Sequence, residues 1–315
     1  MPDRLGPALT APIVDRLVIV GLGLIGSSFA RAARRMNVAR TVVAADASPS
    51  VRARVAELGF ADVVAPDLAS AAEGADMVVL CVPVGACGIV AEQMAGSLRP
   101  GAIISDVGSV KGSVVAQVQP HLPEGVHFVP AHPVAGTEHS GPDAGFATLF
   151  AGRWAILTPP EGTDPAATER VRAVWEAFGS NVEVMTPAHH DLVLAITSHV
   201  PHLIAYNIVG TAADLEEVTQ SEVIKFSAGG FRDFTRIAAS DPTMWRDVFL
   251  NNKDAVLEML GRFSEDLTAL QRAIRWGDGE TLFNLFTRTR AIRRGIIELG
   301  QETAEPDFGR RKPEA

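Results

Sequence analysis

The sequence predicts an α/β protein in which an N-terminal doubly wound sheet is followed by an all-helical C-terminal domain. Over residues 15–186, short apolar and β-branched runs alternate with segments of helical composition, the pattern of strands joined by crossover helices. Over residues 187–299, only helical periodicity is found. We therefore expect three segments, at 13–186, 187–302 and 303–315, of which the last is a solvated tail.

The expected strands of the first domain are continuous apolar runs, which suit parallel strands buried on both faces. They lie at 17–20, 41–44, 77–82, 102–105, 126–129 and 154–157. Segments such as 27–36 and 50–58 have the composition of the helices between them. The alternation predicts a parallel sheet covered by helices.

The helices of the second domain are expected to begin and end at recognisable signals. Asp241 and Pro242 form a helix start, with Asp as N-cap and Pro in the first turn, and this helix is expected over 243–275. The Gly-Asp-Gly run at 277–279 ends it, and a last helix is expected over 280–299. Long apolar helix faces need covering, so we expect this domain to form a homodimer.

Composition narrows the classes of partner and compartment. The formal net charge of −9 disfavours nucleic acid and anionic membranes as partners. Residues 1–12 lack the features of a signal peptide, and no apolar run approaches the ~18 residues of a transmembrane helix. The two cysteines provide no disulfide framework and fit a reducing compartment. We therefore expect a cytoplasmic protein.

A glycine turn lies between the first expected strand and the first expected helix. Its residues, all expected to contact a dinucleotide, are Gly21, Leu22, Gly23, Leu24, Ile25 and Gly26. In this context Gly21 allows a tight turn, Gly23 lets the backbone approach a pyrophosphate, and Gly26 permits close helix–strand packing. The free N–H groups at the helix start favour phosphate. The motif predicts a Rossmann-type domain that binds a nicotinamide dinucleotide, and the alternative is a glycine turn without a ligand.

Asp46 indicates which dinucleotide is bound. It ends the second expected strand, twenty residues after Gly26, where a carboxylate accepts hydrogen bonds from ribose hydroxyls and repels a 2′-phosphate. NAD is therefore expected rather than NADP. Arg52 and Arg54 on the next helix leave NADP open, and Asp46 as a mere helix cap is the alternative.

Three further segments carry polar residues where a substrate would lie above the cofactor. They are 106–112 (DVGSVKG), 132–138 (HPVAGTE) and 229–236 (GGFRDFTR). The first two follow expected strands, at the sheet edge where open α/β sheets bind ligands. Each also has a purely structural interpretation: Ser109 as a helix cap, His132 as a hydrogen-bonded loop histidine, and Asp233 with Arg236 as a surface pair.

The chain resembles the prephenate/arogenate (cyclohexadienyl) dehydrogenase family, over about residues 15–299. The matching segments are 21–28 (GLGLIGSS), 106–112 (DVGSVKG), 132–141 (HPVAGTEHSG), 197–202 (TSHVPH) and 229–247 (GGFRDFTRIAASDPTMWRD). The resemblance implies NAD-dependent oxidative decarboxylation of prephenate to 4-hydroxyphenylpyruvate, or of arogenate to tyrosine, in tyrosine biosynthesis. It implies no metal.

The resemblance also implies roles for particular residues. His132 is the catalytic base that accepts the proton of the ring hydroxyl, and Ser109 hydrogen-bonds the same hydroxyl and orients the histidine. Arg236 holds a substrate carboxylate. Further residues expected around the substrate are His202, Thr137 and Trp245, with Glu138 and Asp233 at the entrance.

The run at 189–191 (His-His-Asp) is interpreted only as a helix start in which the aspartate pairs locally.

Two other functions of the protein remain open. A β-hydroxyacid dehydrogenase of the 6-phosphogluconate type would need a catalytic lysine followed by an asparagine one turn later, but here Lys253 follows Asn251 and Asn252. An NAD-sensing module without activity would not need Ser109, His132 and Arg236 together. Within the resembled family, a preference for prephenate is expected, with an arogenate-specific enzyme as the alternative.

Overall fold

The computed structural model describes residues 5–137, 139–219 and 225–298. The chain divides into two compact units, Met1–Leu257 and Glu258–Ala315. The boundary that we place at 186–187 on the sequence stays a prediction. The expected tail at 303–315 lies outside the described residues.

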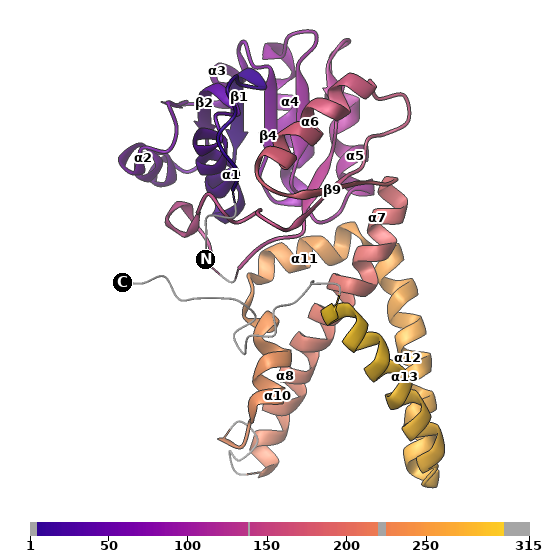
Figure 1. The fold of residues 1–315 in the computed structure, drawn as a ribbon. Coiled ribbons are helices and arrows are strands. Elements are labelled where there is room, and N and C mark those ends of the chain that lie inside the picture. Colours follow the sequence, from indigo (N-terminus) through magenta and orange to yellow (C-terminus); the bar gives the residue numbers. More distant parts are fainter. Residues whose placement is uncertain (1–4, 138, 220–224, 299–315) are drawn as a thin grey trace. The chain divides into compact units, whose positions relative to one another are not determined.

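A six-stranded parallel sheet forms the centre of the first unit (Figure 1). The strands are β1 (Val14–Val20), β2 (Ala39–Ala45), β3 (Val63–Val64), β4 (Met77–Leu80), β5 (Ile103–Asp106) and β6 (His127–Phe128). Their spatial order is β3-β2-β1-β4-β5-β6, the doubly wound order of dinucleotide-binding sheets. The expected fold class is confirmed, and the sequence missed only the two-residue β3 in this sheet.

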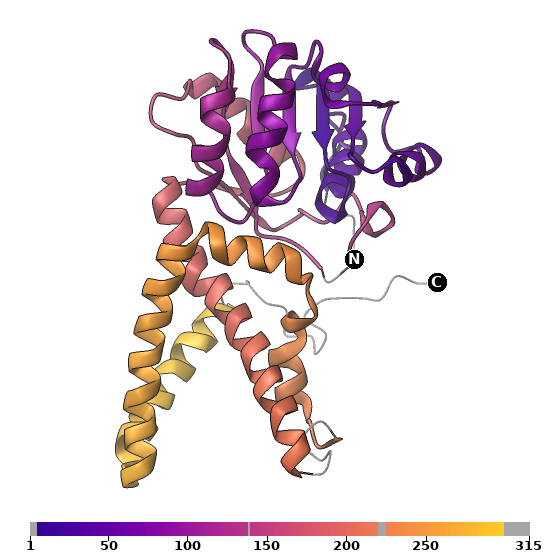
Figure 2. The same cartoon turned by 180° about the vertical axis from the view of Figure 1, so that it is seen from behind.

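Helices cover both faces of this sheet, as Figures 1 and 2 show from opposite sides. On one face lie α1 (Leu24–Arg35) and α6 (Pro165–Ala177), and on the other α3 (Leu68–Ala72), α4 (Cys87–Met94) and α5 (Gly112–Val118). Strand β1 shows why its run is apolar throughout: Leu17 and Ile19 enter one core, and Val18 and Val20 enter the other. A further helix, α2 (Pro49–Leu58), follows β2.

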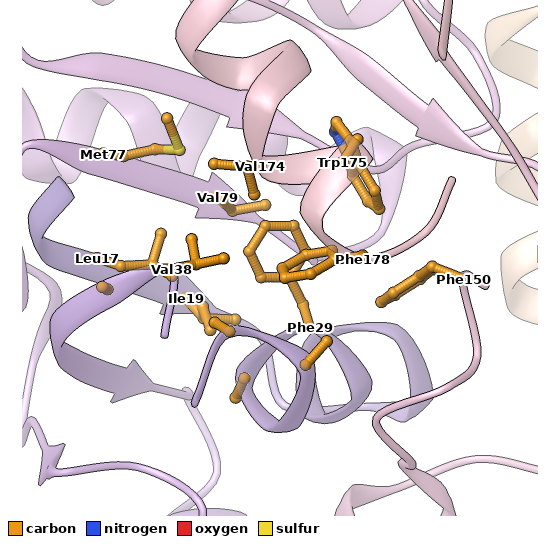
Figure 3. Close-up of a cluster of buried hydrophobic side chains, with 14 of the residues drawn as sticks. Leu17, Ile19, Phe29, Val38, Met77, Val79, Phe150, Val174, Trp175 and Phe178 are labelled. Carbon is orange, nitrogen blue, oxygen red and sulfur yellow. The ribbon is translucent and has the colours of Figure 1, made fainter. Parts of the chain in front are cut away.

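An aromatic cluster anchors α1 on its face of the sheet (Figure 3). Phe29 of α1 lies edge-on to Trp175 and Phe178, with ring centroids 5.2 and 4.8 Å apart. Phe150 completes the cluster, 5.2 Å from Trp175. Edge-to-face pairs at these distances add about 0.5–1.5 kcal/mol each beyond their buried area. The cluster therefore fixes the helix whose first turn carries the glycine motif.

A second, three-stranded sheet carries His132 and was only partly expected. It consists of β7 (Ala131–Pro133), antiparallel to β8 (Trp154–Leu157), which pairs in parallel with β9 (Asn181–Val184). The strand expected over 126–129 is found as β6, but the expectation that His132 lies in the loop after it is wrong, because His132 lies on β7. Pro130 has no N–H with which to continue the ladder of β6, so the chain leaves the main sheet and pairs with β8 instead.

The rest of the first unit is helical. It contains α7 (Pro187–Leu194), a π-helical turn (Ala195–His199), α8 (Val200–Thr219), α10 (Gly229–Thr235), a short 3₁₀ turn (Arg236–Ala239) and α11 (Pro242–Asn251). The single helix expected over 243–275 is wrong, because α11 ends before Asn252 and α12 (Lys253–Trp276) begins after it. The buried Asn252 side chain bonds to Asp191 and His199, and its backbone leaves helical geometry at φ −110° and ψ 32°.

One helical stretch corrects the expectation that nothing in the chain is long and apolar enough to cross a membrane. Within the 29 residues of Pro187–Leu215, an 18-residue window has a mean hydropathy of 1.5, which meets that criterion by length and composition alone. The apolar run is not continuous, which is why the sequence pattern missed it. His190, Asp191 and His199 of this stretch are buried against polar partners of the same unit.

The second unit contains the remainder of α12 and α13 (Gly279–Glu298). The expected break between them is confirmed: Gly277 has φ +68°, and the Asp278 side chain accepts from the Thr281 N–H at 3.0 Å. Several large apolar side chains of this unit are exposed, among them Trp276 at 75% and Phe283 at 70%.

Candidate active site

In the glycine turn, two of the three glycines have no room for a Cβ atom, and the third has open space beside it. Gly21 has φ +92°, and a Cβ there would lie 2.5 Å from the Cys81 carbonyl oxygen. A Cβ on Gly26 would lie 1.9 Å from the Gly21 carbonyl oxygen. A Cβ on Gly23 would meet nothing within 4 Å. The turn is therefore packed against β4 and α1 on one side and leaves its backbone accessible on the other.

A cavity of about 760 Å³ lies above this turn. Its walls include Gly21, Leu22, Gly23, Asp46, Ala47, Arg52 and Cys81. Helix α1 begins here without a side-chain cap, so its first N–H groups are available to an anion. Leu24 and Ile25, expected at the cofactor, have side chains that pack in the core below the turn, and neither residue is among those that line the cavity.

Asp46 is held by the turn itself. Its Oδ2 accepts from the Leu22 N–H at 2.8 Å and its Oδ1 from the Ser48 N–H at 2.9 Å. A carboxylate has about four acceptor positions, so both oxygens retain capacity for hydroxyl donors. The N-cap of α2 is Ser48 rather than Asp46, which disfavours the helix-cap interpretation. Arg52 donates to the carbonyl oxygens of Asp46 and Ala47, at 2.6 and 3.1 Å, and so braces the same loop.

A fully buried ion pair, Lys111 with Asp106, lies beside the strand that carries His132. The Lys111 ammonium donates to Asp106 and, at 2.8 Å, to the carbonyl oxygen of Ala131. Asp106 also accepts from the Gly108 N–H at 2.8 Å. Burial raises the pKa of Asp106, and the charge of Lys111 opposes that rise. Because Ala131 immediately precedes His132, this pair ties β5 to the strand that carries the histidine.

His132 takes part in a hydrogen-bonded chain that reaches α7. Its Nδ1 lies 2.9 Å from His190 Nε2, and His190 Nδ1 lies 2.8 Å from Asp191 Oδ1. The Asp191 carboxylate also accepts from the N–H groups of Lys111 and Gly112, each at 2.8 Å. Asp191 therefore caps α5, which has no side-chain cap of its own.

Burial sets the protonation states of the hydrogen-bonded side chains His132, His190 and Asp191. It lowers the pKa of His132 well below 6.5, and the neighbouring His190 and Lys111 act in the same direction. Burial is also the main cause of the lowered pKa of His190. For Asp191 burial acts upward, but the hydrogen bonds from His190, Lys111 and Gly112 outweigh it and the pKa is lowered. At neutral pH both imidazoles are neutral and the carboxylate is charged.

Two further histidines extend the polar cluster. His199 Nδ1 lies 3.0 Å from Asn252 Nδ2, which also donates to the Asp191 carbonyl oxygen at 2.9 Å. The His202 Nδ1–H donates to the Ser198 carbonyl oxygen at 2.8 Å, and its ring stacks on Trp245 with centroids 3.7 Å apart. Burial lowers the pKa of His202, and the nearby charge of Arg236 adds to that effect.

The expected site residues are only partly brought together. His202, Trp245 and Arg236 lie close to one another. Ser109 lies in the β5–α5 loop with its backbone beside His199, but no hydrogen bond of its hydroxyl is found in the part of the chain that the structure describes. A hydrogen bond from Ser109 to His132 is therefore not seen, and His132 Nδ1 lies against His190 instead. Thr137 is exposed and its hydroxyl accepts from the His139 N–H at 3.3 Å, while Glu138 lies outside the described residues.

Several residues of the site escaped the sequence interpretation. They are Lys111, His190, Asp191, His199 in its buried position, and Asn252. The available signal was the His-His-Asp run at the start of α7, where a charged side chain beside two imidazoles is costly to bury without partners. Within residues 5–137, 139–219 and 225–298, no group of three or more His, Cys, Asp or Glu side chains is arranged to hold a metal ion.

The buried histidines predict a loss of stability in acid. Burial lowers the pKa of His199 from 6.5 to about 4, so between these values the unfolded chain binds more protons than the folded chain. The contribution is complete above pH 6.5 and is lost as the pH falls toward 4. His199 alone is expected to lower the free energy of unfolding by about 2 kcal/mol between pH 7.5 and pH 5.

This prediction is checked by urea unfolding at the two pH values and one protein concentration. The variant His199→Gln should lose a matching part of the pH dependence, whereas His189→Gln, at an exposed position on α7, should keep it. An identical pH dependence in the His199→Gln variant would contradict the assignment.

Comparison with known proteins gives concordant matches over most of the chain. Residues 29–184 match the sequence model of the prephenate dehydrogenase nucleotide-binding domain, and residues 186–288 that of the prephenate dehydrogenase dimerization domain. The cyclohexadienyl dehydrogenase of Zymomonas mobilis is 44% identical over 281 residues, covering 89% of this chain and 96% of that protein. The prephenate dehydrogenase of Bacillus subtilis is 34% identical over 295 residues, covering 93% and 79% respectively.

Solved structures resemble the chain at the level of the whole fold. The prephenate dehydrogenase from A. aeolicus in complex with hydroxyphenyl propionate and NAD⁺ is 35% identical, with a TM-score of 0.84, over 90% of this chain and 98% of that one. Synechocystis arogenate dehydrogenase is 28% identical, with a TM-score of 0.77, over 89% of this chain and 99% of that one.

Proposed function

Because the chain belongs to the prephenate dehydrogenase family, we propose that it catalyses the NAD-dependent oxidative decarboxylation of prephenate to 4-hydroxyphenylpyruvate in tyrosine biosynthesis. In this reaction the ring carbon that bears the hydroxyl loses a hydride, the hydroxyl loses its proton, and loss of carbon dioxide makes the ring aromatic. The observation that carries the proposal is the buried His132, whose lowered pKa keeps the imidazole neutral and therefore able to accept that proton.

The glycine turn supports NAD as the cofactor. The open space at Gly23 and the uncapped N-terminus of α1 fit a pyrophosphate, and Asp46 fits the adenine-ribose hydroxyls. When bound, the nicotinamide supplies the hydride acceptor. The charge of Asp46 beside a 2′-phosphate would be repulsive, which favours NAD over NADP.

The other expected site residues are proposed to bind and orient the substrate. Arg236 holds a carboxylate of the substrate, for which a planar guanidinium is well suited. Ser109 hydrogen-bonds the ring hydroxyl, and His202, Trp245 and Thr137 line the substrate side of the pocket. A site built in this way orients the substrate and accepts one proton, while aromatisation supplies much of the driving force.

One observation supports arogenate as a second substrate. The Ser198 carbonyl oxygen can only accept, so His202 carries its proton on Nδ1 and presents a bare Nε2. A bare nitrogen accepts a hydrogen bond from the ammonium group of arogenate but not from the keto group of prephenate. The 44% identical relative is named a cyclohexadienyl dehydrogenase, which fits a dual substrate range.

We further propose that the protein is a cytoplasmic homodimer. The match to a dimerization domain over residues 186–288 supports a second copy as the partner. Large apolar side chains are exposed on α8, at Ile208 and Leu215, and in the second unit at Ile274 and Phe286. The two free cysteines, Cys81 and Cys87, fit a reducing compartment.

Steady-state assays with prephenate and arogenate, each with NAD and with NADP, test the proposal. Turnover of prephenate with NAD is expected, with a lower kcat/KM for NADP and measurable turnover of arogenate. A well-folded, NAD-binding protein that oxidises neither cyclohexadienyl substrate would contradict the proposed reaction. A preference for NADP would contradict only the role of Asp46.

A further inference from the structure

The hydrogen bonds that link His132, His190 and Asp191 determine which nitrogen of each imidazole carries its proton. Asp191 Oδ1, His190 Nδ1, His190 Nε2 and His132 Nδ1 follow one another at 2.8 and 2.9 Å. His190 is fully buried, and His132 and Asp191 are each 8% exposed. Every hydrogen bond needs one donor and one acceptor, so the proton position at one end determines the next.

The Asp191 carboxylate, at one end of this hydrogen-bonded series, can only accept. Asp191 has a lowered pKa and is therefore charged, and it receives the N–H groups of Lys111 and Gly112 as well as His190 Nδ1. A charged carboxylate has no proton to donate. His190 Nδ1 must therefore carry the proton of that bond.

The proton on His190 Nδ1 determines the proton positions of both imidazole rings. His190 is neutral, because burial lowers its pKa, so a proton on Nδ1 leaves Nε2 as an acceptor. His132 Nδ1 must then donate to it, and since His132 is also neutral, its Nε2 has no proton. We infer that His190 and Asp191 are positioning residues that hold His132 as its Nδ1–H tautomer, with Nε2 bare toward the substrate hydroxyl. The role in catalysis rests on the proposed function, but the tautomer is a property of the free protein.

The charges around the two rings agree with this arrangement. His132, on β7, faces His190 from α7, Lys111 from the loop before α5, and His199 from the π-helical turn. His190 faces Asp191, Lys111 and Asp106. Burial, with smaller contributions from His190 and Lys111, keeps His132 neutral before the reaction, and the carboxylate of Asp191 supports the positive charge that His132 gains when it accepts a proton.

The variant Asp191→Asn tests the inference with almost no change in shape. Asp191 Oδ1 accepts from both the His190 Nδ1–H and the Lys111 N–H, so the amide oxygen of asparagine takes that position and both histidines keep their tautomers. The charge that supports protonated His132 is lost, so kcat is expected to fall, but by less than the roughly 10²–10⁴-fold contribution of the base itself. The KM for NAD should change little, because neither His190 nor Asp191 lines the cavity over the glycine turn.

A second pair of variants separates positioning from packing. His190→Gln retains a carbonyl oxygen that can accept from His132 Nδ1–H, so it should keep more activity than His190→Phe, which cannot. His189→Asn, one residue away and exposed, is the matched control and should behave as wild type. Thermal unfolding and NAD affinity of each variant report whether the fold is intact. Equal kcat losses in folded His190→Gln and His190→Phe proteins would overturn the positioning role.

A spectroscopic measurement decides the tautomer without any substrate. In protein labelled with ¹⁵N-histidine at pH 7.5, the His132 signals, assigned with His132→Asn, should show a protonated Nδ1 and an unprotonated Nε2. Asp191→Asn should keep this pattern, because its amide oxygen still accepts from the His190 Nδ1–H. A protonated Nε2 in wild-type protein would overturn the inference whether or not the enzyme oxidises prephenate. Conversely, the expected tautomer in a protein inactive on both substrates would leave the inference intact and refute the proposed function.

Discussion

Replacing His132 with asparagine is expected to lower kcat for prephenate oxidation by about 10²–10⁴-fold, the usual contribution of a general base. Asparagine has no nitrogen that accepts a proton near neutral pH, so the ring hydroxyl would have to lose its proton to water. NAD affinity should remain nearly unchanged, because the side chain lies outside the walls of the cavity over the glycine turn. Loss of the bond to His190 should destabilise the fold by about 1 kcal/mol.

The same substitution at His139 provides the control for this prediction. His139 lies in the loop after the same strand but is exposed, so His139→Asn should retain wild-type kcat and stability. Initial rates, NAD titration by calorimetry and thermal unfolding distinguish the three effects. Unchanged turnover in His132→Asn would remove the catalytic assignment, whereas a loss of NAD binding would indicate that the variant has disturbed the fold instead.

Replacing Lys111 with methionine is expected to destabilise the protein by about 3–5 kcal/mol, since it leaves a buried carboxylate without its counter-charge. Both Lys111 and Asp106 have no exposed side-chain surface. Burial already raises the pKa of Asp106, and the charge of Lys111 opposes that rise. The variant also loses the bond from the ammonium to the Ala131 carbonyl oxygen, so His132 should become less well positioned and kcat should fall as well.

The double variant Lys111→Met/Asp106→Asn gives this prediction its sharpest form. Asparagine keeps an acceptor for the Gly108 N–H but carries no charge, so the double variant should be more stable than Lys111→Met alone. Lys253→Met, at an exposed position, should change the free energy of unfolding by less than about 0.5 kcal/mol. Urea unfolding at pH 7.5 measures all three. A single variant no less stable than the double would show that the buried charge is not the cause.

The features that the sequence predicted well are local. The apolar runs specified the strands because a strand buried on both faces excludes polar residues, and β8 begins and ends where its run does. The glycine turn was predictable because each glycine answers a steric need within a few residues or on the neighbouring strand. For the same reason, the break at Gly277 was correctly expected.

The features that escaped depend on contacts between residues far apart in the chain. His132 and His190 are separated by 58 residues, and the Lys111 N–H and its acceptor Asp191 by 80. No local pattern distinguishes a buried Asp191 with three donors from an aspartate in the first turns of an ordinary surface helix. The interruption at Asn252 was missed for a similar reason, since its cause is a side chain that bonds to residues 53 and 61 positions away.

Asp191 has a consequence for how natural variation at this site should be interpreted. Its carboxylate both caps α5, through the N–H groups of Lys111 and Gly112, and receives His190. At most active sites, residues chosen for chemistry reduce stability, and selection for abundance and selection for activity act in opposite directions. Here one carboxylate satisfies both requirements. A screen that scores only the amount of folded protein in cells should therefore retain Asp191 as strictly as a screen for growth without tyrosine. At Arg236 the two screens should differ, because the abundance screen should tolerate changes that the growth screen rejects.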